Sequence, residues 1–131
     1  MINNNITIQK RSAVFAVRCV KAYCELNKRH FDDAGKVLAK QFLRSASSVG
    51  ANCPKGYRFA YAEAEFAQSK ADFISKYSIA LKEAAETRFW INLMIDSNIV
   101  THQKFSYLLE ENNAIIRILI STINKLKSNQ K

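Results

Sequence analysis

The sequence has few of the residues that turn or break a chain. Its 131 residues include three glycines and one proline, which is too few for the many turns of an all-β fold. It has no uncharged apolar run near the roughly 20 residues of a membrane span. The first residues, MINNNITIQK, lack the apolar segment of a signal peptide. We therefore expect a cytoplasmic, all-α protein without a membrane partner, forming a single domain over residues 1–131.

Cysteine and histidine are also scarce, and their number and spacing argue against disulfide bonds, metal binding and nucleophilic catalysis. Three cysteines (Cys19, Cys24 and Cys53) do not suggest a disulfide framework. No pair among them and the two histidines, His30 and His102, has the spacing of a metal site. No nucleophile–base pair or glycine-rich phosphate loop stands out either. We expect no metal, no cofactor and no enzymatic activity.

Acidic residues are outnumbered. The chain has 20 Lys and Arg against 11 Asp and Glu, a formal net charge of +9. Such an excess favours a polyanionic partner such as RNA or DNA. A solvated basic surface without any partner is the alternative.

Apolar residues recur at three- and four-residue steps in four segments, which predicts four helices. The first spans about 8–29, the second runs from a cap at Asp32 or Asp33 to Cys53, the third spans about 59–97, and the fourth runs from a cap at Thr101 to about Leu126. Ser97 and Asn98 are expected to end the third helix. Short connections make successive helices neighbours, so we predict an antiparallel up-down four-helix bundle.

The stretch SVGANCPKGYRF, residues 48–59, gathers two glycines and the only proline. Pro54 has no N–H to donate to the carbonyl of Gly50, and Gly56 can adopt the left-handed conformation that closes a helix. We therefore expect the second helix to kink or end there and the third to begin near Phe59.

The first helix has more apolar surface than one core needs. Its predicted apolar side covers more than half of the circumference, and Arg11 is placed on the remaining charged arc. That side carries Ala13, Ala16, Val17, Val20 and Cys24 and is extended by Phe15, Cys19, Tyr23 and Leu26. The third and fourth helices also have surplus apolar residues, which indicates a closed homo-oligomer. Lys70 and Arg88 fall on the apolar seam of the third helix, where they either extend towards solvent or face a polar channel.

Cations gather on the first two helices and the following turn. Lys36, Lys40 and Arg44 share one stripe at four-residue spacing. The predicted nucleic-acid-binding residues are Lys36, Lys40, Arg44, Lys55, Arg58, Arg18, Lys21 and Lys28. Tyr57 and Phe59 would either stack on unpaired bases or pack the turn against the core. The carboxylates of the third helix are interpreted as a solvated or ion-paired face.

Two stretches carry a family resemblance, LRSASSVGANCPKG and SKADFISKYSIALKEAAETRFWINLM. They resemble the four-helix-bundle proteins of the 23S ribosomal RNA intervening-sequence family, which is similar to the accessory variability proteins of diversity-generating retroelements. The resemblance implies a homopentamer without established enzymatic activity, with nucleic acid and a reverse transcriptase as partners. Lys55 departs from the family pattern, in which a glutamate commonly stands at this position, and Arg88 stands where a glutamate is expected.

Two functions stay open from the sequence. The first is a non-catalytic nucleic-acid-binding or reverse-transcriptase-type accessory module, in which the cationic stripes contact phosphate. The second is a protein–protein interaction scaffold without nucleic-acid binding, in which charge provides solubility and partner choice. Salt-sensitive binding of RNA or DNA would separate them.

Overall fold

The computed structural model describes residues 6–29, 32–53 and 70–128. These residues form four helices: α1 (Ile8–Asn27), α2 (Asp33–Ala51), α4 (Lys70–Asp96) and α5 (His102–Ser128). Within these ranges there is no strand, so the expected all-α, four-helix class is confirmed. The predicted start of the third helix near Phe59 and the predicted cap at Gly56 lie outside the described residues.

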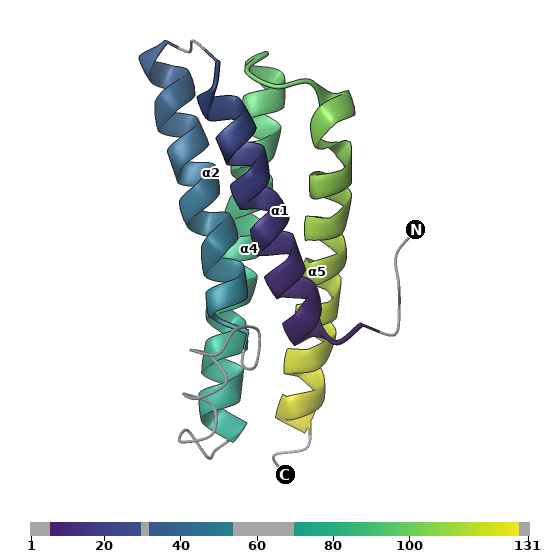
Figure 1. Cartoon of the computed structure of the whole chain (residues 1–131). Helices are drawn as coiled ribbons and strands as arrows, with labels where there is room; N and C mark the ends of the chain where they lie inside the picture. Colours follow the sequence, from purple (N-terminus) through teal and green to yellow (C-terminus); the bar gives the residue numbers. More distant parts are fainter. Residues whose placement is uncertain (1–5, 30–31, 54–69, 129–131) are drawn as a thin grey trace.

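The four helices lie side by side along one long axis (Figure 1). Each helix packs against two others: α1 contacts α2 and α5, and α4 contacts the same two helices. Arg11 of α1 contacts Glu111 of α5, and Arg18, seven residues later in α1, contacts Tyr107, which precedes Glu111. The two helices therefore run in opposite directions.

The helix ends follow local capping rules. The side chain of Asp32 accepts a hydrogen bond from the Gly35 amide at 2.9 Å, and Thr101 Oγ1 accepts one from the Lys104 amide at 3.2 Å. α4 ends in a Schellman motif, in which Asn98 has φ 60° and the Ile99 amide donates to the Met94 carbonyl at 2.9 Å. The caps predicted at Asp32 and Thr101, and the end predicted at Ser97 and Asn98, are confirmed.

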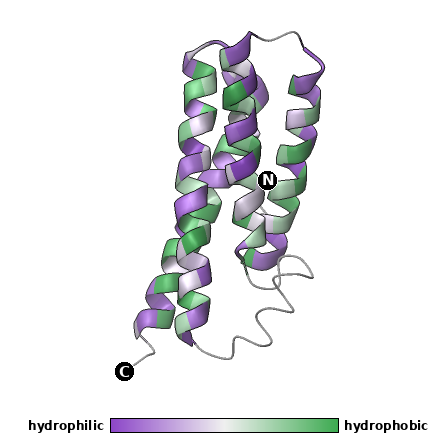
Figure 2. Ribbon diagram, turned by 90° about the vertical axis from the view of Figure 1, so that its left-hand side faces the viewer, coloured by the Kyte–Doolittle hydropathy of each residue, from purple (hydrophilic) through white to green (hydrophobic). Residues whose placement is uncertain are grey.

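The core is formed by one side of each helix. Figure 2 shows hydrophobic and hydrophilic segments alternating along the ribbons, as expected for helices with one buried face. Phe42 and Phe105 meet edge to face, with ring centroids 5.7 Å apart. The largest side chains that are fully buried are Phe15, Phe42, Ile91, Met94, Ile115 and Leu119. These residues come from all four helices, so the core is shared by the whole bundle.

The buried side of α1 is only part of the predicted apolar side, with Ala13, Phe15, Ala16, Cys19 and Leu26 buried. Val17 and Val20, expected in the core, are 41% and 42% exposed, and Cys24 is exposed as well. α2 approaches α1 closely at Gly50: a Cβ atom there would lie 3.2 Å from both the Ala16 Cβ and the Ser12 carbonyl oxygen. The helix therefore turns its small residues towards α2, and the valines face outwards.

On α4 the structure favours one of the two alternatives left open for the cations of the seam. Arg88 and Lys70, predicted on the apolar seam, are exposed. The buried side of α4 carries Tyr77, Ala80, Ala84, Thr87, Ile91 and Met94. No polar channel is needed to accommodate either cation, because both already reach solvent.

Candidate nucleic-acid interface

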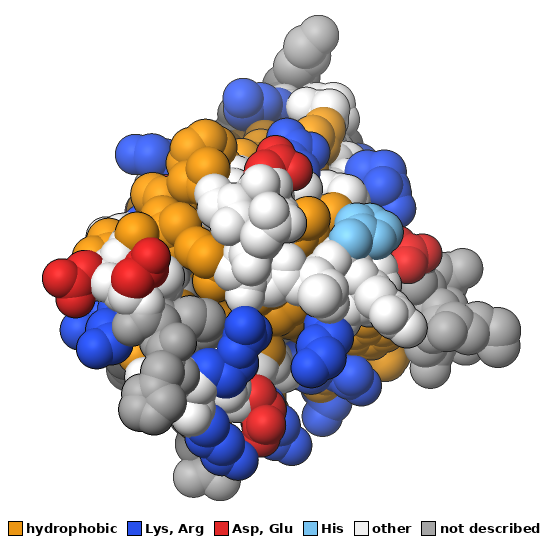
Figure 3. All heavy atoms as spheres, turned by 90° about the horizontal axis from the view of Figure 1, so that it is seen from above, with side chains coloured by type: hydrophobic (Ala, Val, Ile, Leu, Met, Phe, Trp, Pro, Cys, Tyr) orange, Lys and Arg blue, Asp and Glu red, His pale blue; other side chains and the backbone are white. Residues whose placement is uncertain are grey.

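Positive charge is concentrated in the first half of the chain. Residues 7–53, which contain α1 and α2, carry nine Lys and Arg against three Asp and Glu. Residues 70–128, which contain α4 and α5, carry eight against six. Seen from above, Lys and Arg side chains gather on the side of the molecule where α1 lies, and further ones are interspersed with hydrophobic side chains on the opposite side (Figure 3). The α1–α2 side is therefore the candidate nucleic-acid interface.

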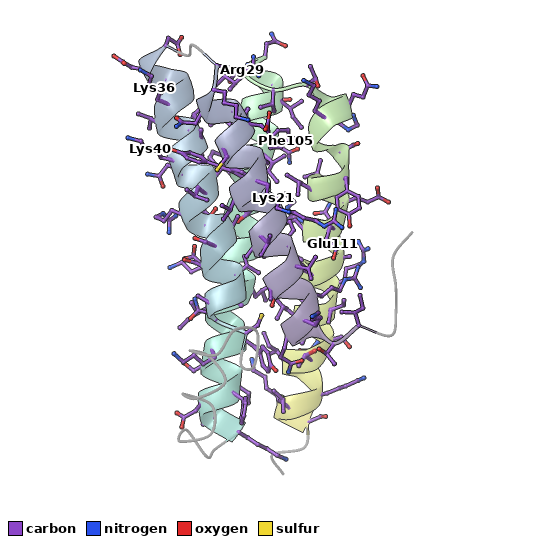
Figure 4. All side chains as sticks on the ribbon, in the orientation of Figure 1. Lys21, Arg29, Lys36, Lys40, Phe105 and Glu111 are labelled. Carbon is purple, nitrogen blue, oxygen red and sulfur yellow. The ribbon has the colours of Figure 1, made fainter. Side chains whose placement is uncertain are left out.

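Two of the predicted α2 cations are free to contact a partner. Lys36 and Lys40 are exposed, and no carboxylate among the described residues pairs with either of them. They lie one turn apart and both project from α2 (Figure 4). Lys21 of α1 is likewise exposed and without an ion pair in the described ranges. These three lysines, Lys21, Lys36 and Lys40, are called the lysine face below.

Arg44 does not continue the stripe as predicted. Its guanidinium turns to α4, where it pairs with Glu83 at 3.3 Å and with Glu86 at short range, and it bonds Gln41 of its own helix. Trp90 donates its indole N–H to the same Glu86 carboxylate at 3.2 Å. Arg44 thus links α2 to α4, and its charge is offset within the molecule. The ion-paired interpretation of the α4 carboxylates applies to Glu83 and Glu86.

Arg11, placed on the charged arc of the first helix, is buried instead. Its side chain and that of Glu111 are only 7% and 12% exposed. The guanidinium donates from Nε and Nη2 to the two carboxylate oxygens of Glu111, at 2.8 Å each. These hydrogen bonds raise the pKa of Arg11 despite the opposing effect of burial. The pair joins α1 to α5, and its charge is unavailable to an external partner.

Three further cations, in α1 or just after it, have partners at the surface. Arg18 lies over the ring of Tyr107, with its Cζ 4.9 Å from the ring centroid. Lys28 pairs with Glu25 at 2.9 Å, a hydrogen bond that raises the Lys28 pKa, and both side chains are mostly exposed. Arg29, just after α1, donates to the Ile99 carbonyl at 3.2 Å, which fastens the end of α1 to the α4–α5 turn. Exposed pairs of this kind are weak and leave the cations open to exchange partners.

Part of the predicted interface lies outside the described residues. This applies to the cations Lys55 and Arg58 and to the aromatic residues Tyr57 and Phe59. Their predicted roles in phosphate contact and base stacking stay predictions.

The described residues hold no cluster suited to a metal ion. No group of three His, Cys, Asp or Glu side chains converges among them. Cys19 and Cys53 are buried, and burial raises the pKa of both thiols, that of Cys53 to about 11. Both therefore remain protonated near neutral pH, which makes them poor nucleophiles.

Within the described ranges, no helix has the length and hydropathy needed to cross a membrane.

Several large apolar side chains of the described residues stay on the surface. On α1 they are Val14, Val17 and Val20, which recur at three-residue steps and are 38–42% exposed. Val37 of α2 and Phe89 of α4 are each 57% exposed. The surplus apolar surface predicted from the sequence is therefore present on more than one helix.

Comparison with known proteins finds a matching family and a solved structure of similar fold. The family model described as "23S rRNA-intervening sequence protein" matches residues 4–121. A solved structure from Bacteroides thetaiotaomicron VPI-5482, described as a protein with unknown function from the S23 ribosomal protein family, is similar at 39% identity. The match covers 89% of this chain and 98% of that chain, with a TM-score of 0.74. No curated protein matches the chain.

Proposed function

The chain belongs to the 23S rRNA-intervening sequence protein family, and from its charge distribution we propose that it is a non-catalytic, nucleic-acid-binding helical bundle. Its partner is single-stranded or structured RNA or DNA, held through phosphate contacts in the cytoplasm. In the accessory role that the family resemblance implies, a reverse transcriptase would act on the nucleic acid that this protein holds.

The observation that carries the proposal is the lysine face. Lys21, Lys36 and Lys40 are exposed, and no carboxylate of the described residues offsets them. In contrast, Arg11 and Arg44 are neutralised by Glu111, Glu83 and Glu86. Phosphate groups of a nucleic acid supply the missing anions, and the counterions they release favour binding. Lysine ammonium groups contact phosphates as point charges and read no base edges, so binding should be largely independent of sequence.

Self-assembly is part of this proposal. Val14, Val17 and Val20 expose apolar surface beside the lysine face, and burying such surface between copies is favourable. We propose that the up-down bundle closes into a homo-oligomer, most simply the pentamer that the resemblance implies. Each copy would then contribute its own lysine face, and several weak phosphate contacts would act together.

The protein-scaffold alternative rests on a different observation. Among the described residues, Val37 of α2 and Phe89 of α4 are the most exposed large apolar side chains, each at 57%. Trp90 is partly buried and contacts Phe89 edge to face, with ring centroids 5.0 Å apart. An aromatic surface of this kind suits a protein partner.

The test is a pair of charge-matched double variants. Lys36→Glu/Lys40→Glu removes two lysines of the lysine face, whereas Lys82→Glu/Arg88→Glu makes the same change in net charge on exposed residues of α4. Binding to a single-stranded RNA is measured from about 50 mM salt upwards, where electrostatic contacts are still strong at the start. We expect the α2 variant to lose most of its affinity and its slope of log affinity against log salt to become shallower by about 0.7 for each lost contact.

The α4 control separates a located interface from a general effect of charge. If both variants weaken binding equally, the lysine face has no special role. If the wild type does not bind RNA or DNA at about 50 mM salt, the nucleic-acid function is wrong and the scaffold takes its place. Arg44 is left unchanged in this design because its reversal would also break the contacts with Glu83 and Glu86.

A further inference from the structure

Arg18 and Tyr107 form a second feature on the cationic side of the molecule. Arg18 comes from α1 and Tyr107 from α5, and the guanidinium carbon lies 4.9 Å from the ring centroid. Tyr107 is 48% exposed, and Arg18 is exposed as well. Two planar groups, one cationic and one aromatic, are thus held together at the surface by two different helices.

The surroundings of Tyr107 differ from those of the other strongly exposed aromatic residue of the described ranges. Phe89 lies next to Trp90, which is hydrogen-bonded to the carboxylate of Glu86. Glu86 is in turn paired with Arg44, so carboxylate and guanidinium offset each other there. Tyr107, in contrast, lies beside a guanidinium whose charge no described carboxylate offsets.

The position of the pair connects it with the lysine face. Lys21 follows Arg18 by one turn on α1, so the two side chains project from neighbouring positions. In Figure 4, Lys21 lies between Lys36 and Lys40 on one side and Glu111 of α5 on the other. A strand whose phosphates contact Lys36, Lys40 and Lys21 therefore crosses α1 and arrives at the Arg18–Tyr107 pair.

Building on the proposed function, we propose that the Arg18–Tyr107 pair is a stacking site for an unpaired base of a single-stranded nucleic acid. The flat face of any base can stack on an aromatic ring or a guanidinium, so the site selects bases that are unpaired rather than a particular sequence. Bases within a duplex are already stacked on one another and cannot reach it. The protein should therefore prefer single strands and loops to duplexes.

The experiment uses a single-stranded RNA that carries one 2-aminopurine, whose fluorescence is quenched when the base stacks. We expect wild-type protein to quench this emission and to bind the single strand more tightly than the same sequence annealed to its complement. Tyr107→Leu should abolish the quenching and weaken single-strand binding about fivefold or more, because one stacked base contributes at least that much. The salt slope should not change, since no phosphate contact is lost.

Two further variants make the result specific. Arg18→Lys keeps the positive charge but removes the planar guanidinium, so it should also reduce quenching with an unchanged salt slope. Phe89→Leu removes the other exposed aromatic and should leave quenching and affinity as in the wild type. Helicity measured by circular dichroism shows whether each variant is folded, and Arg18→Lys decides the question if Tyr107→Leu is not.

The outcomes distinguish this inference from the proposed function. Binding that depends on Lys36 and Lys40 but is equal for Tyr107→Leu and Phe89→Leu overturns the stacking site alone. Equal affinity for the single strand and the duplex overturns it as well. An absence of any binding at low salt overturns both the stacking site and the proposed function.

Discussion

Arginines and lysines of α1 and α2 have different surroundings, although they contribute equally to the net charge. A guanidinium offers five donors in a planar arrangement and pairs readily within a protein, whereas an ammonium group is strongly hydrated and remains mobile. Arg11 and Arg44 bind carboxylates of α5 and α4, and Arg18 lies on an aromatic ring. Lys21, Lys36 and Lys40 are left for an external anion. The arginines therefore join helices, and the lysines define the candidate interface.

The Arg11–Glu111 pair gives a prediction at this scale. Arg11→Met removes both hydrogen bonds and leaves the mostly buried carboxylate of Glu111 without its partner. The free energy of unfolding in urea should fall by about 3 kcal/mol. The double variant Arg11→Met/Glu111→Leu should recover much of this loss, because no uncompensated charge remains. A double variant that is no more stable than Arg11→Met alone would show that the two residues are not coupled.

At the scale of helices, packing depends on a few small or polar residues at the contacts. Gly50 lets α2 approach the backbone of α1 at Ser12. Ser45 of α2 accepts a hydrogen bond from Thr87 of α4 at 2.9 Å, and Asn112 of α5 donates to the Ala84 carbonyl of α4 at 2.8 Å. All of these residues except Ala84 are polar or lack a side chain, and all are buried. Such contacts are specific to one register, because a shifted helix would leave buried polar groups without partners.

The close approach at Gly50 gives a prediction for the α1–α2 contact. Gly50→Val places a branched side chain where even a Cβ would lie 3.2 Å from the Ser12 carbonyl and the Ala16 Cβ. We expect the free energy of unfolding to fall by about 2 kcal/mol, as in other overpacked cores. Ala51→Val is the matched control, because Ala51 is the next residue of α2 and is exposed. It should cost less than about 1 kcal/mol, the difference in helix propensity. Equal losses in the two variants would argue against a tight contact.

At the scale of the whole molecule, charge and apolar surface are unevenly distributed. The α1–α2 half holds most of the excess positive charge, and valines of α1 lie exposed within it. A monomer would leave these valines in water, whereas an oligomer would bury them and place several cationic faces in one particle. The arrangement suits a partner that is long, negatively charged and able to contact more than one copy.

The oligomer is tested by the mass of the native particle. Light scattering during gel filtration should give a multiple of the 14.9 kDa chain, with five copies as the expected number. Val17→Glu/Val20→Glu should lower this mass, because carboxylates buried between copies are unfavourable. Ser75→Glu/Ser78→Glu, on exposed positions of α4, is the control and should leave it unchanged. A stable wild-type monomer at micromolar concentration would contradict the proposed assembly.

The sequence by itself determined the helices and the ends that involve Asp32, Asn98 and Thr101. These features are local: periodicity marks a helix, and a cap needs only groups within a few residues. The exposure of Lys36, Lys40 and Lys21 was predictable for the same reason, because each lies on a polar side of its own helix.

Only the tertiary structure decided which side of α1 is buried and which cations are free. Both sides of α1 carry apolar residues, so periodicity alone leaves its rotation open, and the approach of α2 at Gly50 selects the side with Ser12 and Ala16. Arg11, Arg18 and Arg44 meet Glu111, Tyr107 and Glu86, partners that lie 42 to 100 positions away in the chain. Such pairings depend on how the helices are placed against one another, which no local pattern in the sequence contains.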